Sequence, residues 1–194
     1  MALIPEYLPG ATPLDLDELV SLIPKHITTQ HELNEWEQLN IEQGEAWARR
    51  QRKDILSEAF VRQLHQKMFG ETWRWTGSFR KSNKNIGVDW QQVSVKLRDL
   101  LNDTQYQITH ATYTPDEIAT RFHHRLVLIH PFPNGNGRHA RMMTDLLIQQ
   151  LGQPGFTWGS KHLTDLTETR TRYIAALRAA DGGDIQPLLA FVRS

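Results

Sequence analysis

The chain has 194 residues, 39% of them hydrophobic, which suits one domain with a sizeable core and a single active site. Its 22 basic residues balance 22 acidic ones, so no net charge favours a nucleic acid or an anionic membrane, and we expect neither as a direct partner. The lack of cysteine excludes disulfides, thiolate zinc sites and a cysteine nucleophile, and the lack of a leader-like or bilayer-spanning apolar run makes the cytoplasm the expected location.

Prolines are frequent in the first two dozen residues, which predicts an irregular arm with at most a short helix around residues 14–23. Thr29 and Glu32 then have capping-box spacing, and a hydrophobic stripe predicts a helix to about residue 50. A second helix is expected between a cap at Asp54 and a stop at Gly70. We therefore divide the chain into an N-terminal arm, residues 1–49, and a main domain, residues 50–194.

Helical spacing is lost between residues 73 and 88, where aromatic residues and glycines predict a loop or a small β-hairpin. Asp89 has capping-box-like spacing and opens another helix, and Thr114 followed by Pro115 opens one that continues directly into His130. Long alternating strands and repeats are absent, so the fold class is mainly α with one minor β element. The remaining helices are expected at about 138–152, 163–181 and within 185–192.

The segment "HPFPNGNGRHAR", residues 130–141, interrupts this helical pattern. Pro131 ends the preceding helix, and Gly135 and Gly137 permit a tight loop that leads into the next helix. The unpaired N–H groups and the positive dipole end of that helix suit an anion, most often a phosphate. The segment therefore predicts a phosphate-binding loop.

Three side chains of the segment add chemistry to this loop. Arg138 and Arg141 lie three positions apart, so they share a helix face and can hold successive phosphates of a nucleotide. His130 ends the preceding helix, and a histidine of ordinary pKa suits removal of a proton from a hydroxyl nucleophile. The combination indicates a nucleotide held by its phosphates beside a general base, although a Gly-Asn-Gly turn or two helix arginines alone are more often structural.

A metal-hydrolase interpretation receives little support. The chain clusters several histidines near the segment, but they lack the ligand spacing of known zinc sites. We expect the surplus histidines to be surface or packing residues; the cluster comprises His123, His124, His130 and His139.

The segment resembles the signature of the Fic family, in the Fic/Doc superfamily: His-Pro-Phe-x-acidic-Gly-Asn-Gly-Arg-x-x-Arg. The match holds at every defined position except the acidic one. Segments 64–80 and 173–192 are similar to flanking parts of the family's domain, so the resemblance covers about residues 50–193 and identifies 50–194 as a Fic domain. The arm also resembles the bacterial subgroup called mobile mystery protein B.

This resemblance implies a Fic-type helical core with a small β-hairpin flap, and transfer of AMP from ATP to a Tyr, Ser or Thr hydroxyl of a target protein. His130 would activate the hydroxyl. The amides of residues 135–137 and the Asn136 side chain would hold the phosphates, Arg138 would neutralise the pyrophosphate leaving group, and Arg141 would reach the terminal phosphate. The flap that pairs with the target would contain Asn85, Ile86, Gly87 and Val88.

The departure from the signature is Asn134, which stands where the family has the acidic ligand of a Mg²⁺ or Mn²⁺ ion bound with ATP. Its carbonyl oxygen suits a hard cation but brings no charge, so metal binding should weaken. Two other functions stay open: a Doc-like protein phosphotransferase, and a non-catalytic nucleotide-binding or interaction module. Doc-like members lack the second arginine and have a lysine in the loop, so Arg141 and Gly137 favour AMP transfer.

An inhibitory helix is the last feature that the resemblance suggests. Family members often carry Ser/Thr-x-x-x-Glu-Gly/Asn, whose glutamate pairs with the second motif arginine. Thr28 and Glu32 have this spacing, but Leu33 takes the Gly/Asn position, and a Thr29–Glu32 capping box explains the same residues. Besides ATP and a hydroxyl-bearing target, an antitoxin-like or helix-turn-helix protein is the expected partner, in a bacterial toxin–antitoxin setting.

Overall fold

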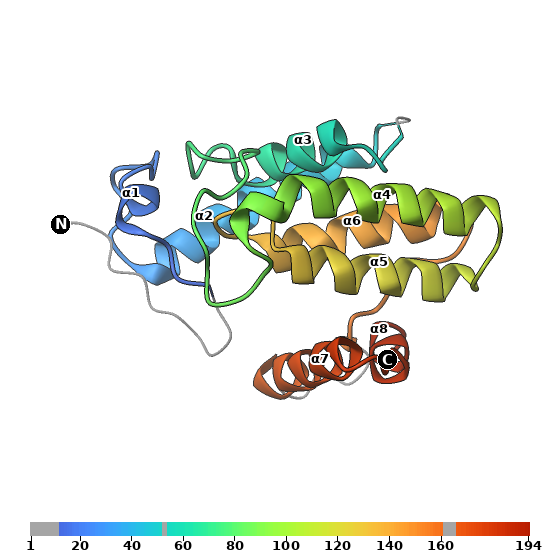
Figure 1. The fold of residues 1–194 in the computed structure, drawn as a ribbon. Helices are drawn as coiled ribbons and strands as arrows, with labels where there is room; N and C mark the ends of the chain where they lie inside the picture. The colour runs from blue at the N-terminus through green and yellow to red at the C-terminus, as the bar shows by residue number, and fades with distance from the viewer. Residues whose placement is uncertain (1–11, 52–53, 161–165) are drawn as a thin grey trace.

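The computed structural model describes residues 12–51, 54–160 and 166–194, and the regular secondary structure in this part of the chain is helical (Figure 1). No helix in these ranges is long and apolar enough to cross a membrane. The helices are α1 (Leu16–Leu19), α2 (Gln30–Ala48), α3 (Glu58–Phe69), the 3-10 helix η1 (Trp90–Gln92), α4 (Val93–Thr109), α5 (Pro115–Ile129), α6 (Asn136–Gln150), α7 (Leu166–Asp181) and α8 (Gln186–Val192).

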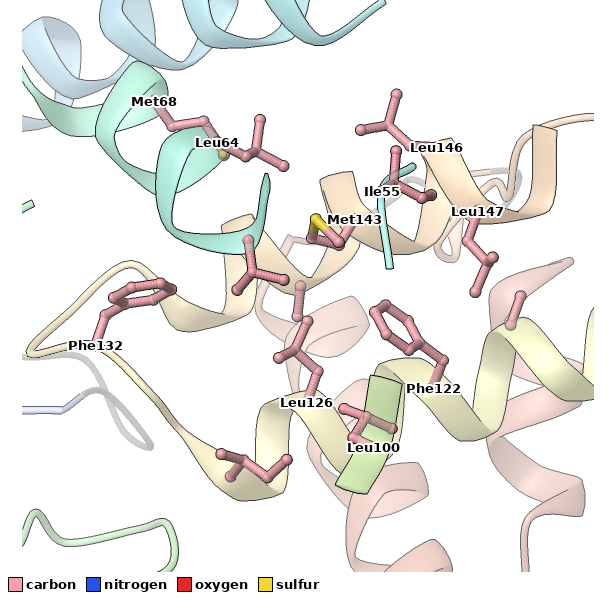
Figure 2. Close-up of a cluster of buried hydrophobic side chains, with 14 of the residues drawn as sticks. Ile55, Leu64, Met68, Leu100, Phe122, Leu126, Phe132, Met143, Leu146 and Leu147 are labelled. Carbon is pink, nitrogen blue, oxygen red and sulfur yellow. The ribbon is translucent and has the colours of Figure 1, made fainter. Parts of the chain in front are cut away.

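The central pair of the fold is α5 and α6, which lie side by side (Figure 1). Helices α4 and α8 contact α5, α3 contacts α6, and α2 packs along α3. The apolar faces of these helices meet in one core, which removes their side chains from water. Figure 2 shows the centre of this core, where the labelled side chains are Ile55, Leu64, Met68, Leu100, Phe122, Leu126, Phe132, Met143, Leu146 and Leu147.

Local capping chemistry accounts for most helix starts. Thr29 and Glu32 form the predicted capping box at the start of α2, and Thr114 accepts the N–H of Glu117 ahead of Pro115, the first residue of α5. The predicted cap of α3 was wrong. Asp54 instead accepts the N–H of Leu56 in a preceding turn.

The N-cap of α3 is therefore Ser57, which accepts the N–H of Phe60.

The division of the chain at residue 49 stays a prediction. Helix α2, on the arm side of that division, packs along α3 and donates from Trp36 Nε1 to the carbonyl oxygen of Glu71.

The predicted small hairpin flap was wrong. Between residues 73 and 89 the chain is an irregular loop, and the β-pairing found in the described residues is one isolated bridge between Leu22 and Trp73. The buried guanidinium of Arg80 donates to the carbonyl oxygens of Ser82 and Val88. A side chain thus satisfies acceptors that a β-ladder would otherwise pair, so the loop closes without strands.

Candidate active site

His130 lies at the junction between α5 and the motif loop, in a backbone conformation that is rare for a residue with a side chain. Its φ and ψ are 52° and 61°, in the left-handed region, and its N–H still bonds to Leu126 at the end of α5. Pro131 follows, and a proline disfavours the right-handed helical conformation for the residue before it. The helix therefore stops at His130 and turns the imidazole out of the helical path.

Two residues of the irregular loop, Arg80 and Gly87, contact His130 and hold it in place. Arg80 Nε donates to the His130 carbonyl oxygen at 2.7 Å, and the Arg80 N–H donates to the Pro131 carbonyl at 2.9 Å. Gly87 has φ 108°, and a Cβ at this position would lie 2.8 Å from the His130 Cβ. A glycine is needed here because the predicted flap runs directly against the histidine.

The motif loop is anchored in the core by Phe132, which is fully buried (Figure 2). The Asn136 amide spans the loop: its Oδ1 accepts the Phe132 N–H at 2.9 Å, and its Nδ2 donates to the Phe132 carbonyl at 2.8 Å. The ring of His65 stacks on Phe132 with centroids 3.8 Å apart. The side chain of Asn136 thus holds the loop, and its predicted contact with a phosphate stays a prediction.

His65 also fixes the turn before Gly135. Its Nδ1 accepts the Gly77 N–H at 3.1 Å, so the neutral ring carries its proton on Nε2, which donates to the Asn134 carbonyl at 3.1 Å. Burial holds the pKa of His65 well below its ordinary value, which keeps this tautomer neutral. Gly135 has φ 76°, and a Cβ there would lie 2.7 Å from the ring of Phe69.

The N-terminus of α6 lies where the sequence predicts an anion site. Gly135 is the N-cap and brings no capping side chain, so the first-turn N–H groups of the 15-residue helix lack the usual side-chain partner. Among the described residues, a Cβ at Gly137 would meet no other part of the chain within 4 Å, so this side of the first turn carries no close contact from them. An oxyanion placed there would be bound by N–H groups at the positive end of the helix dipole.

The two motif arginines turn to different elements. Arg138 Nη1 contacts Glu37 of α2 at 2.6 Å, and its Cζ lies 4.9 Å from the ring centre of Phe69. Arg141 lies over the ring of Tyr173 at 4.6 Å and over Trp158 at 5.7 Å. Its Nε is buried and makes no hydrogen bond among the described residues. The two guanidiniums thus contact different elements here, and the prediction that both bind phosphates of one nucleotide stays a prediction.

Glu37 is a residue that the sequence interpretation missed. Its carboxylate is buried, with Oε1 accepting from Trp73 Nε1 at 2.8 Å and Oε2 accepting from Arg138. Glu32, the predicted inhibitory residue, is instead exposed and accepts the N–H groups of Thr28 and Thr29 at 2.9 and 3.0 Å. These backbone bonds hold the pKa of Glu32 below its ordinary value. In α2, Glu37 therefore reaches a motif arginine, whereas Glu32 caps the helix.

The imidazole of His130 is neutral near pH 7. Burial lowers its pKa to about 4, and the positive charges of Arg80 and Lys84 act in the same direction. Its Nε2 lies 3.1 Å from the hydroxyl of Thr12. Nδ1 makes no hydrogen bond among the described residues, and the backbone of Val127 raises the pKa of the imidazole, against the larger effect of burial. A proton on Nδ1 leaves the Nε2 lone pair directed at the hydroxyl.

The surroundings of Asn134 do not fit a divalent cation held by the protein. Its Oδ1 accepts the Gly135 N–H at 2.6 Å, and its Nδ2 donates to the Thr12 carbonyl at 3.0 Å. No cluster of three or more His, Cys, Asp or Glu side chains that could hold a metal occurs in the ranges that the structure describes. The four histidines considered for zinc are included in that search, and His123 and His139 are buried among core residues.

Arg80, Thr12 and Glu37 contact the motif from outside it, and none of them carries a local sequence signal. In the sequence, Arg80 is one cation in an aromatic-rich stretch and Thr12 is one hydroxyl in an irregular arm, so neither indicates a functional role. Of the predicted flap residues, Gly87 lies against His130, Val88 binds Arg80 through its carbonyl, and Ile86 is partly exposed. The site is thus built from the motif loop, the irregular loop 73–89 and two segments of the predicted arm.

The chain is similar to known proteins in sequence and in fold. The model of the Fic/DOC family matches residues 55–148. The protein adenylyltransferase fic-1 of Caenorhabditis elegans is 30% identical over 144 residues, which are 72% of this chain and 27% of that protein. The solved structure of Fic-1 (134–508) from C. elegans matches with a TM-score of 0.65 and 27% identity, over 81% of this chain and 48% of that one.

A bacterial structure shows the same fold at lower identity. The BepC protein of Bartonella tribocorum, solved with bound AMPPNP, matches with a TM-score of 0.69 and 19% identity, over 92% of this chain and 97% of that one. The present chain spans about a quarter of the length of the curated fic-1 relative. The residues that match the family model, 55–148, run from the start of α3 through the motif loop to near the end of α6. The chain belongs to the Fic/DOC family.

Proposed function

We propose that this chain is a protein adenylyltransferase, which moves AMP from ATP to a Tyr, Ser or Thr hydroxyl of a protein. The observation that carries the proposal is a neutral His130 whose Nε2 already lies 3.1 Å from a hydroxyl, beside the uncapped and open N-terminus of α6. A general base must lie within hydrogen-bonding reach of the proton that it removes. The curated relatives named protein adenylyltransferase support the same reaction.

The site residues take the roles that the family resemblance implies. His130 accepts the hydroxyl proton, and the first-turn N–H groups of α6 hold the phosphates and stabilise charge that develops on them. Arg138 neutralises the pyrophosphate leaving group once it separates from Glu37. Arg141 reaches the terminal phosphate by leaving the face of Tyr173. The irregular loop with Asn85, Ile86, Gly87 and Val88 receives the target segment.

The divalent cation belongs to the substrate in this proposal. ATP enters as its Mg²⁺ or Mn²⁺ complex, because the neutral and already engaged Asn134 does not provide a cation site of its own. The phosphate oxygens of ATP then supply the charged ligands.

Autoinhibition is assigned to Glu37 instead of Glu32. The buried Glu37 carboxylate occupies Arg138, so it competes with a nucleotide phosphate for the same guanidinium. Its replacement by glutamine keeps an oxygen for Trp73 Nε1 but removes the charge. We expect Glu37→Gln to raise AMP transfer several-fold, and Glu32→Gln, a matched change on the same helix, to leave it unchanged. Equal effects of the two variants would contradict this assignment.

The test of the main proposal uses ATP labelled on its α-phosphate, with Mg²⁺ or Mn²⁺ and a bacterial lysate. The wild-type chain should label at least one protein, and His130→Ala should label none. Labelling that persists in His130→Ala would contradict the role of the histidine. If label is transferred only from the γ-phosphate, the Doc-like phosphotransferase replaces the present proposal. Absence of transfer from either position, with nucleotide binding retained, favours a non-catalytic module.

The biological context that we propose rests on the resemblance of the arm to mobile mystery protein B. We propose a bacterial, cytoplasmic toxin–antitoxin context, in which an antitoxin-like or helix-turn-helix protein is the partner. Copurification of the tagged chain with the protein encoded beside it tests this. Elution of the chain alone would contradict the pairing.

A further inference from the structure

The N-terminal segment of the chain lies in the place where a target hydroxyl must be activated. Thr12 is buried at 7% exposure, and its Oγ1 lies 3.1 Å from His130 Nε2. This distance is that of a hydrogen bond between a hydroxyl donor and a neutral imidazole acceptor. In the described ranges, no other hydroxyl is hydrogen-bonded to this nitrogen. The chain therefore presents its own hydroxyl to its own base.

The motif loop holds the backbone of this segment as well. Asn134 Nδ2 donates to the Thr12 carbonyl oxygen at 3.0 Å. A carboxylate has no proton to donate when it is ionised, so an Asp or Glu at position 134 would repel this carbonyl. The amide that weakens the family's metal ligand is thus the group that positions Thr12. One hydrogen bond, from the Asn134 amide to the Thr12 carbonyl, thus explains both the departure from the signature and the position of the arm.

Ion pairs fix the next turn of the arm to the irregular loop. Lys84 Nζ contacts Asp15 at 2.8 Å and Glu18 at 2.6 Å, with the lysine side chain 2% exposed. Ser82 Oγ donates to Asp15 at 2.6 Å, and Trp75 Nε1 donates to the Glu18 carbonyl at 3.2 Å. Hydrogen bonds from Lys84 and Ser82 hold the pKa of Asp15 below its ordinary value. Figure 1 shows α1 beside this loop. The arm thus contacts the irregular loop, which is where we propose that the target segment binds.

We propose that Thr12 is a site of self-adenylylation, with the arm serving as an intramolecular substrate. This inference rests on the proposed adenylyltransferase function. In the reaction, Thr12 Oγ1 attacks the α-phosphorus of ATP, a new oxygen–phosphorus bond forms, and the bond from that phosphorus to the bridging oxygen of the β-phosphate breaks. The hydroxyl proton passes to His130 Nε2, and pyrophosphate leaves. No oxidant or further reactant is required.

Two properties distinguish this reaction from modification of another protein. The acceptor is tethered beside the base, so the rate per chain should not depend on protein concentration. Each chain has one Thr12, so the reaction stops at one AMP per chain. Modification also replaces a neutral buried hydroxyl by a charged phosphodiester, which favours release of the arm from the site.

The experiment uses the purified full chain with ATP and Mg²⁺ or Mn²⁺, followed by intact mass measurement and peptide mapping. Wild type should gain one AMP on the peptide with Thr12. Thr12→Ser keeps a hydroxyl and should also be modified, whereas Thr12→Val keeps the shape without the hydroxyl and should lose at least nine-tenths of the label, which is about a tenfold drop. A tagged His130→Ala chain mixed with wild type should stay unmodified, because the transfer is intramolecular.

A parallel reaction with lysate separates this inference from the function on which it rests. Thr12→Val should label lysate proteins at least as strongly as wild type, because only the tethered acceptor is removed. Lysate labelling by wild type without AMP on Thr12, or an equal amount of self-label on Thr12→Val, would overturn the self-modification site and leave the function standing. Absence of label from both chain and lysate would overturn both.

Discussion

The motif loop and the N-terminal arm meet at His130, but different forces hold them. The loop is anchored by apolar burial and special backbone conformations, with Phe132 fully buried and His130 and Gly135 at positive φ. The arm segment 12–18 is held by hydrogen bonds and ion pairs to Asn134 and Lys84. Buried apolar contacts fix one geometry, whereas the polar contacts of the arm end at Asp15, whose side chain is 47% exposed, so the arm can separate there without opening the apolar core. The comparison indicates a base that is fixed in place and an acceptor that can leave.

As the pH falls, the motif loop should be destabilised before the arm. The resulting loss in the free energy of unfolding is the largest effect that we expect. Burial lowers the pKa of His123 to about 3 and of His139 to about 4, and it holds that of His65 well below its ordinary value. The unfolded chain therefore binds more protons below about pH 6.5, and the free energy of unfolding falls as pH drops from there towards about 4. Each histidine contributes on the order of 1 kcal/mol per pH unit.

Urea unfolding at several pH values between about 7 and 4 measures this slope. The lowered pKa of Asp15 preserves its pairing with Lys84 until the pH falls below the ordinary carboxylate range. A free energy of unfolding that stays constant down to about pH 5 would contradict the buried neutral histidines.

Removing the apolar anchor should be the most damaging single substitution of the loop. Phe132→Ala leaves a cavity beside the stacked ring of His65, and the free energy of unfolding should fall by about 3–5 kcal/mol. AMP transfer should fall with it, because His130 loses its fixed position. Phe132→Leu is the control, with most of the volume kept and a smaller loss. Equal stability of the alanine variant and wild type would show that the loop is not held by burial.

Two glycines of the loop allow two effects to be tested apart: the backbone conformation at Gly135 and the free space at Gly137. At Gly135 a Cβ needs φ 76° and meets the ring of Phe69, so Gly135→Ala should cost about 1–3 kcal/mol. Gly137 has ordinary helical φ and open space, so Gly137→Ala should leave stability unchanged and weaken ATP binding. Unfolding and nucleotide titration of the pair measure both effects. Comparable destabilisation by the two changes would contradict the assignment of open space to the phosphate site.

Asn134→Asp should produce the smallest change in stability, and this change should be confined to the arm. It removes the hydrogen bond to the Thr12 carbonyl, worth about 0.5–1.5 kcal/mol. Backbone amide exchange of residues 12–18 should become faster, while α5 and α6 serve as the unchanged internal reference. Self-modification of Thr12 should decrease several-fold relative to the labelling of lysate proteins by the same variant, because the new carboxylate also restores the family's metal ligand and acts on both reactions alike. Unchanged exchange in the arm would mean that Asn134 does not hold it.

The sequence by itself determined what depends on neighbours three or four positions apart. Hydrophobic spacing and caps gave α2, α5 and their starts at Thr29 and Thr114, because helix hydrogen bonds and capping are local. The same reasoning placed the break at His130 and the glycine loop before α6. The cap at Ser57 was missed because Asp54 is an equally good cap by residue type.

Only the tertiary structure decided which distant side chains meet these elements. Thr12 and His130 are 118 positions apart, and Glu37 and Arg138 are 101 apart, so no local pattern relates them. Arg80 replaced the expected hairpin because its guanidinium, once buried, must find carbonyl acceptors. Local chemistry thus fixes the helices and the loop, whereas the burial and pairing of polar groups from distant segments decide which hydroxyl faces the base.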